Sequence, residues 1–107
     1  AAPAIVMDRA TVRRMENNAT RACGVLAAMS NPARLLILCH LAEGEKAVGE
    51  LEPLIGLSQS ALSQHLAVLR GKHLVRTRRD GQSILYSLAS KEAIALMHTL
   101  HEQFCKC

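Results

Sequence analysis

Cysteine side chains are the groups in this chain best suited to redox chemistry. Four are present, Cys23, Cys39, Cys105 and Cys107, and no two of them form a Cys-x-x-Cys pair. In the cytosol such cysteines serve as free thiols, metal ligands or redox centres rather than as a permanent disulfide framework. A thiol-disulfide enzyme that uses the C-terminal Cys-x-Cys is disfavoured, because that pair lacks the helix N-terminus that lowers a thiol pKa.

Imidazole groups near the C-terminus offer a second kind of chemistry. His98, His101 and Cys105 are separated by three and four residues, which places them along one strip of a helix. Together with Cys39 or His40 they would supply nitrogen and sulfur ligands to a zinc- or copper-like ion. This spacing also arises by chance on exposed helix faces, so a metal-responsive site remains the alternative hypothesis.

Hydrogen-bonding and basic side chains gather in the middle of the chain. Residues 59–71 predict a helix with one apolar side and one polar side. A polar helix face can enter the major groove of DNA, where Gln and Ser bind base edges and Arg binds phosphate. The candidate base readers are Gln59, Ser60, Ser63 and Gln64, and the candidate positioning residues are Arg70, Arg76, Arg78, Arg79 and Gln82.

Local start and stop signals predict the helices that position these groups. Asn31-Pro32 combines a favourable N-cap with proline at the first helical position. A short helix over residues 48–55 follows, and Gly56 permits a tight turn. Ser58 then caps the polar helix. These signals predict a helix-turn-helix unit.

A hairpin follows the polar helix. After Gly71 the apolar period becomes two, and Asp80-Gly81 is a strong hairpin signal between residues 74–79 and 82–88. The fold class is therefore mainly α, a winged helix-turn-helix of about five to six helices with a two-stranded β-hairpin wing. All of residues 1–107 form this single DNA-binding and dimerisation domain.

Two longer helices flank this unit. A first helix over residues 7–29 is expected to break or bend at Asn17-Asn18. A last helix runs from Ser90 to the C-terminus and carries an apolar stripe that includes Leu96, Leu100 and Phe104. The stripe fits either a core face or a dimer surface.

Composition limits the classes of function. With 107 residues the chain holds one small core, which favours a binding module over an enzyme with a catalytic cleft. The net charge is +4, and five basic residues between positions 70 and 79 face only Asp80. This charge favours a polyanionic partner. No apolar stretch reaches the roughly 20 residues that span a bilayer, so a cytoplasmic location is expected.

Four segments carry a resemblance to a known family: SNPARL at 30–35, VGEL at 48–51, LSQSALSQHL at 57–66, and RDGQ at 79–82 with Tyr86. They resemble the ArsR family of small bacterial transcriptional repressors. The resemblance implies a homodimer paired through the first and last helices. Such a dimer presents two recognition helices to palindromic double-stranded operator DNA.

The metal sites of that family are not retained here. The arsenic-type cysteine motif would fall on Ala47–Glu50, which contains no thiol. The zinc-type site would fall on Ser90, Glu92, Gln103 and Lys106, of which only Glu92 is a useful ligand. No metal or other cofactor is therefore expected.

Cys39 and Cys105 have a different family counterpart. In their contexts, LILC and FC, they resemble the dithiol of the sulfide- and persulfide-responsive branch, the BigR- and SqrR-like repressors. The resemblance implies that reactive sulfur species, the inducers, link the two thiols through a disulfide or polysulfide and release DNA. By itself Cys39 fits a small buried hydrophobe. Cys23 and Cys107 are treated as accessory.

Overall fold

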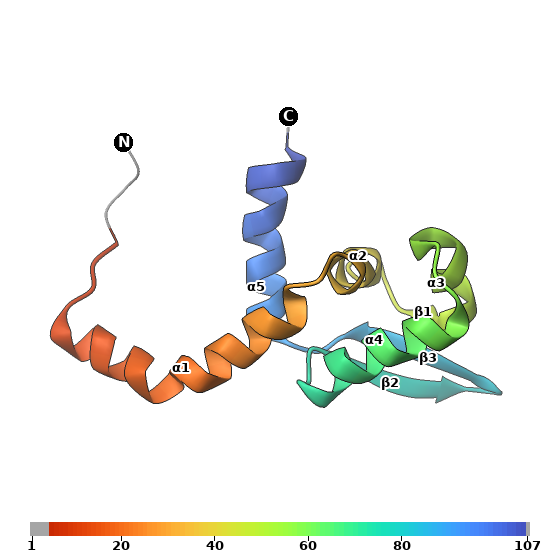
Figure 1. Ribbon diagram of the computed structural model, residues 1–107, viewed down its shortest axis with the longest axis horizontal. Coiled ribbons are helices and arrows are strands. Elements are labelled where there is room, and N and C mark those ends of the chain that lie inside the picture. The colour runs from red at the N-terminus through yellow and green to blue at the C-terminus, as the bar shows by residue number, and fades with distance from the viewer. Residues whose placement is uncertain (1–4, 107) are drawn as a thin grey trace.

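The computed structural model describes residues 5–106, so Cys107 lies outside the described residues. Two pairs of consecutive helices are separated by a short strand and followed by a β-hairpin and a last helix, and Figure 1 shows the sheet packed beside the short helices. The elements are α1 (Arg9–Met29), α2 (Pro32–Leu41), β1 (Lys46–Ala47), α3 (Val48–Ile55), α4 (Gln59–Gly71), β2 (Val75–Asp80), β3 (Ser83–Leu88), α5 (Lys91–Leu100) and a π-helical turn, η1 (His101–Cys105).

The predicted helix starts are confirmed by their capping hydrogen bonds. The Asn31 side chain accepts from the backbone N–H of Arg34 at 3.1 Å, and Ser58 Oγ accepts from Ala61 at 3.2 Å. At the start of α3, the Glu50 carboxylate accepts from the backbone N–H of Ala47 at 3.0 Å. That bond supplies a cap which the alanine side chain lacks, because it satisfies a free amide at the helix start.

The structure differs from the elements expected from the sequence at three places. The first helix starts at Arg9 rather than Met7, after Asp8 as its N-cap. It is not broken at Asn17-Asn18, and α1 is bent along its length in Figure 1, so of the two expected possibilities only the break is wrong. The wing hairpin gains a third strand, because β1 pairs with β3 and the order is β1-β3-β2. A strand of two residues is too short to show a period of two in the sequence. The last helix widens into a π-helical turn at His101–Cys105.

The buried core lies where α2, α3, α4 and the sheet meet. Its fully buried large side chains are Ile37, Leu38, Leu51, Leu62, Leu66, Leu69 and Leu74. The first half of α1 extends away from this core in Figure 1, and its Val12 and Met15 are exposed. The core thus orients α4 and the wing, while α1 keeps apolar side chains uncovered.

No single helix among residues 5–106 is long and apolar enough to cross a membrane. Among these residues, only α1 and α2 taken as a pair are long and apolar enough for a membrane span, and the two helices are bent by 91° relative to each other.

Candidate nucleic-acid interface and thiol pair

The two sides of α4 differ as predicted. Leu62, Leu66 and Leu69 are buried in the core, which fixes the rotation of the helix about its axis. Val68, an apolar residue of the same helix, is by contrast 42% exposed. All five predicted nucleic-acid residues of this helix are exposed: Gln59, Ser60, Ser63, Gln64 and Arg70.

One arginine, not foreseen as a functional residue, ties α4 to the end of α1. Arg34 Nε donates to the backbone oxygen of Ala28 at 2.6 Å. Its Nη1 lies 3.4 Å from Nδ1 of His65 on α4. His65 is partly buried, in agreement with a packing role rather than base reading. Arg34 therefore connects backbone carbonyls near the end of α1 to α4.

The wing carries its basic side chains on alternating faces. Val75 and Thr77 of β2 point toward the core, so Arg76 and Arg78 point to the opposite, outer face. Arg79, in the next position, is exposed beside the hairpin turn. The predicted positioning residues Arg70, Arg76, Arg79 and Gln82 are all exposed. Their contacts with DNA remain predictions.

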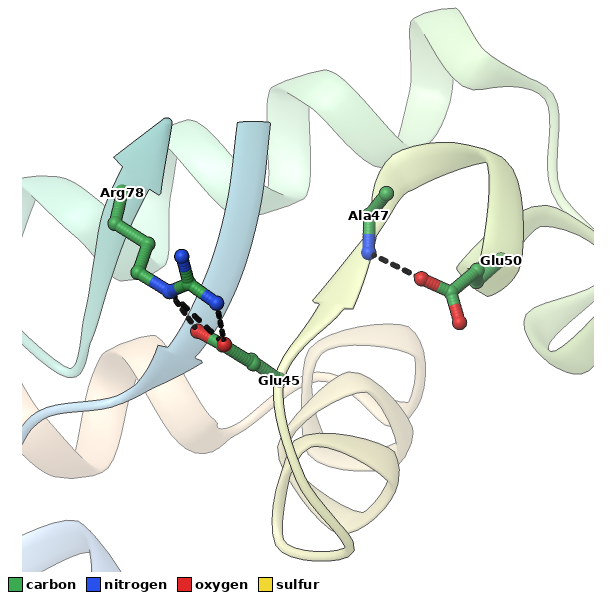
Figure 2. A network of polar contacts seen from close by, with 4 residues as sticks. All are labelled: Glu45, Ala47, Glu50 and Arg78. Carbon is green, nitrogen blue, oxygen red and sulfur yellow. Dashed lines mark hydrogen bonds and ion pairs between the residues drawn. The ribbon is translucent and has the colours of Figure 1, made fainter. Parts of the chain in front are cut away.

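Arg78 differs from the other basic residues because it already has an anionic partner. Its Nε donates to both carboxylate oxygens of Glu45 at 2.9 Å, and its Nη2 donates to one of them (Figure 2). These hydrogen bonds, opposed by slight burial, hold the pKa of Glu45 below its usual value. Sequence reasoning missed this pair because the two residues lie 33 positions apart.

The structure brings Cys39 and Cys105 into electrostatic range of each other. Cys39 lies on α2 and Cys105 ends the π-helical turn, and both are exposed free thiols. Partial burial raises the pKa of Cys39, and the negative charge of the Cys105 thiolate raises it further. Cys23 lies on α1 as another exposed free thiol. The pairing of Cys39 with Cys105, given only by the resemblance, and its chemistry both stay predictions.

The alternative metal site is not assembled within the described residues. Nowhere in residues 5–106 do three His, Cys, Asp or Glu side chains come close enough to hold a metal ion. His40 instead lies 3.1 Å from the Glu43 carboxylate. The spacing of His98, His101 and Cys105 predicted one strip of a helix, but in the part of the chain that the structure describes they do not form such a group.

Glu92, the one potential ligand kept from the zinc-type site, is engaged elsewhere. Arg21 Nη2 of α1 lies 2.5 Å from its carboxylate, and Ser90 Oγ donates to it at 3.1 Å. The hydrogen bond from Arg21 is the largest cause that lowers the pKa of Glu92, to about 2. The pair links α1 to the start of α5.

Known proteins with this fold and sequence are bacterial regulators. Residues 31–77 match the family described as "Bacterial regulatory protein, arsR family". The transcriptional activator HlyU of Vibrio cholerae is 47% identical over 95 residues, which cover 89% of this chain and 88% of HlyU. The protein belongs to the ArsR family. Its relatives make it a DNA-binding transcriptional regulator, a non-enzymatic class of protein.

Other ArsR relatives extend the match to repressors and to structures. The biofilm growth-associated repressor of Xylella fastidiosa is 44% identical, covering 85% of this chain and 80% of the repressor. The crystal structure of that organism's BigR superposes with a TM-score of 0.82 at 42% identity, over 91% of this chain and 99% of BigR. Reduced HlyU also gives 0.82, at 48% identity, over 88% of this chain and 99% of HlyU.

A more distant neighbour bears on assembly. Mb0332 of Mycobacterium bovis, a possible ArsR-family regulator, is described as a homodimeric winged helix-turn-helix DNA-binding domain. It superposes with a TM-score of 0.75 at 29% identity, over 84% of this chain and 83% of the solved fragment. The winged helix-turn-helix fold of the present chain is thereby confirmed.

Proposed function

We propose that this ArsR-family protein is a dimeric repressor that binds palindromic operator DNA in the cytoplasm and releases it when reactive sulfur species link Cys39 to Cys105. The observation that carries the proposal is the placement of these two free thiols, on α2 and at the end of η1, within electrostatic range. A solved structure of the relative HlyU is described as reduced, which supports a redox-dependent state in that relative.

The DNA-binding part of the proposal rests on α4 and the wing. Gln59, Ser60, Ser63 and Gln64 lie on the exposed polar side of a helix whose other side is locked into the core. Amide and hydroxyl groups at such positions can pair with base edges in a major groove about 12 Å wide. Arg70 and the wing arginines would neutralise phosphates and position the helix.

The dimer part rests on uncovered apolar side chains. Met15 and Leu26 of α1 are 51% and 52% exposed, and Phe104 near the end of the chain is 81% exposed. An apolar groove of about 250 Å³ lies between α1, α2 and α5, with Leu35, Leu96 and Leu100 among its lining residues. Apolar surface of this kind marks an association site. The homodimeric Mb0332 domain supports a second copy as the partner.

The proposed bridging reaction begins with an organic persulfide, RSSH. The exposed Cys105 thiolate attacks the terminal sulfur and expels RS⁻, which leaves a persulfide on Cys105. The Cys39 thiolate then attacks Cys105 Sγ and expels HS⁻, so a disulfide forms and the persulfide is reduced. If Cys39 has also become a persulfide, its terminal sulfur attacks instead. HS⁻ again leaves, and the product is a trisulfide.

The length of the bridge can provide selectivity. A direct disulfide requires Cα atoms roughly 4.4 to 6.8 Å apart, whereas an inserted sulfur atom spans a wider gap. The bridge would tether α2 to the C-terminal turn and alter the spacing of the two recognition helices, which must match half-sites about one DNA turn apart. A coupling of about 3 kcal/mol would weaken operator binding roughly a hundredfold.

The test compares single cysteine variants on a duplex that the purified protein selects from random-sequence DNA. Cys39→Ser and Cys105→Ser should bind this duplex normally and stay bound after persulfide treatment. Cys23→Ser, the matched control, should release it like the parent. Mass spectrometry should find peptides with Cys39 and Cys105 joined in the treated parent. Release by Cys39→Ser, or absence of the joined peptides, would show the mechanism to be wrong.

A further inference from the structure

Glu45 lies in a position that the predicted DNA interface does not use. It directly precedes β1, whereas Arg78 lies on β2 at the other edge of the sheet. Ala47 of β1 and Arg78 of β2 both pair with Leu85 of β3. The Arg78 side chain therefore crosses the middle strand to reach the Glu45 carboxylate, as Figure 2 shows.

The Glu45 carboxylate interacts with two of the basic residues of the wing. It accepts hydrogen bonds from Nε and Nη2 of Arg78. Arg76 also lies near enough for its positive charge to favour the ionised carboxylate. Because Arg76 and Arg78 share the outer face of β2, Glu45 neutralises part of the positive charge on that face.

The guanidinium N–H groups that Arg78 donates to Glu45 are the same groups that would bind a DNA phosphate. Two N–H groups of a guanidinium bind carboxylate or phosphate in the same forked arrangement. The pair is exposed, with 56% of the Arg78 side chain and 34% of the Glu45 side chain accessible. An exposed pair of this kind is weak, so a phosphate can replace the carboxylate at low cost.

We infer that Glu45 competes with DNA phosphate for Arg78 and so lowers the affinity of the wing for DNA of any sequence. This inference rests on the proposed DNA-binding face. Phosphate contacts carry no sequence information, so the competition weakens selected and unrelated duplexes alike. As a result, the protein binds DNA less tightly than its number of arginines indicates, and it dissociates from DNA more readily.

The test measures binding to a fluorescein-labelled duplex of mixed sequence by fluorescence anisotropy. Glu45→Gln keeps the shape of the side chain and removes its charge, so it should tighten binding and steepen the salt dependence. The gain should shrink by about 3.5-fold between about 50 and 200 mM salt, because each added phosphate contact raises the salt slope by roughly 0.9. Glu45→Ala, which removes the same charge with a different side chain, should show the same gain.

Two further variants isolate the competition from a general change in charge. Glu43 lies two residues away and contacts His40 rather than an arginine of the wing, so Glu43→Gln is the matched control. It should leave the salt slope unchanged. In an Arg78→Ala background, Glu45→Gln should lose most of its effect, because the competed side chain is gone.

Three results would overturn the inference: weaker or unchanged binding by both Glu45 variants, an equal gain with Glu43→Gln, or an undiminished gain in the Arg78→Ala background. Failure of the proposed DNA-binding face gives a different pattern. In that case either the parent protein binds no duplex in the same assay, or Gln64→Ala has no effect on the duplex that the parent selects.

Discussion

The helix-turn-helix with its wing and the surface formed by α1, α5 and η1 differ in how much of their apolar area is buried within one chain. In the first region Leu51, Leu62 and Leu66 are at most 1% exposed. In the second, Met15, Leu26 and Phe104 keep about half or more of their surface accessible. The first region is folded around its own core. The second keeps apolar side chains exposed, as a surface does when its binding partner is missing.

The same two regions also differ in their polar contacts. Within the wing, Glu45 and Arg78 join the two edge strands of one small sheet. On the other side, Arg21 and Glu92 join α1 to α5 across 71 residues of sequence. Arg34 lies between them and contacts both the end of α1 and His65 of α4. In the proposed mechanism α2, which carries both Arg34 and Cys39, would connect the thiol bridge to the DNA-binding helix α4.

The largest effect is expected from the core of the first region. Leu66→Ala removes a side chain that is 1% exposed and leaves a cavity, so the free energy of unfolding should fall by about 2 to 5 kcal/mol. Urea unfolding followed by circular dichroism measures the loss. If Leu66→Ala destabilises the protein no more than Leu54→Ala, a change at a 48% exposed leucine, the described core is wrong.

Gln64→Ala should act on DNA recognition without affecting folding, because Gln64 is exposed. We expect a loss of about 1 to 3 kcal/mol on the selected duplex and little change on a random one. Arg79→Ala, by contrast, should weaken both duplexes alike and flatten the salt slope. Arg78→Ala should do the same to a smaller extent, since Glu45 already occupies this guanidinium. Equal losses on both duplexes for Gln64→Ala would remove it from the base readers.

Phe104→Ala tests whether the α1–α5 surface is an interface. The side chain is 81% exposed in one chain, so its loss should leave the thermal stability of the monomer nearly unchanged. A buried aromatic at a dimer contact contributes about 1 to 2 kcal/mol, which corresponds to a roughly five- to thirtyfold weaker dimer. Sedimentation equilibrium measures this change. An unaltered dimer dissociation constant would place the interface elsewhere.

The smallest effect concerns the Arg21–Glu92 pair. The pKa of Glu92 falls from 4.5 to about 2 in the folded protein, so the stabilisation is fully present above about pH 4.5 and is lost as the pH falls toward 2. Arg21→Ala should therefore lower the denaturation midpoint at neutral pH, and the difference from the parent should close in acid. Midpoints measured from pH 7 down to acid check this. A difference independent of pH would mean that Arg21 acts through packing alone.

Local signals in the sequence were sufficient for the helix-turn-helix and for the identity of its exposed polar side. Ser58 and Asn31 cap their helices with hydrogen bonds to residues three positions away, so the signal and its effect lie within one turn. Gly81 adopts a φ of 63° in the hairpin turn, which glycine does without strain. The bounds of α4 follow from such signals and from the spacing of its leucines.

The tertiary structure alone determined which charged groups form hydrogen-bonded pairs and which thiols interact through their charge. Glu45 lies 33 residues from Arg78 and Glu92 lies 71 from Arg21, and neither pair leaves a periodic trace in the sequence. The sequence therefore predicted Arg78 as a free phosphate contact and kept Glu92 only as the one useful residue of a lost zinc-type site, and both side chains are engaged in ion pairs. Cys39 and Cys105 were paired only through a family resemblance, and the structure adds that the charge of the Cys105 thiolate acts on Cys39. Local preferences decide the elements, whereas long-range pairs depend on how the apolar faces of those elements pack together.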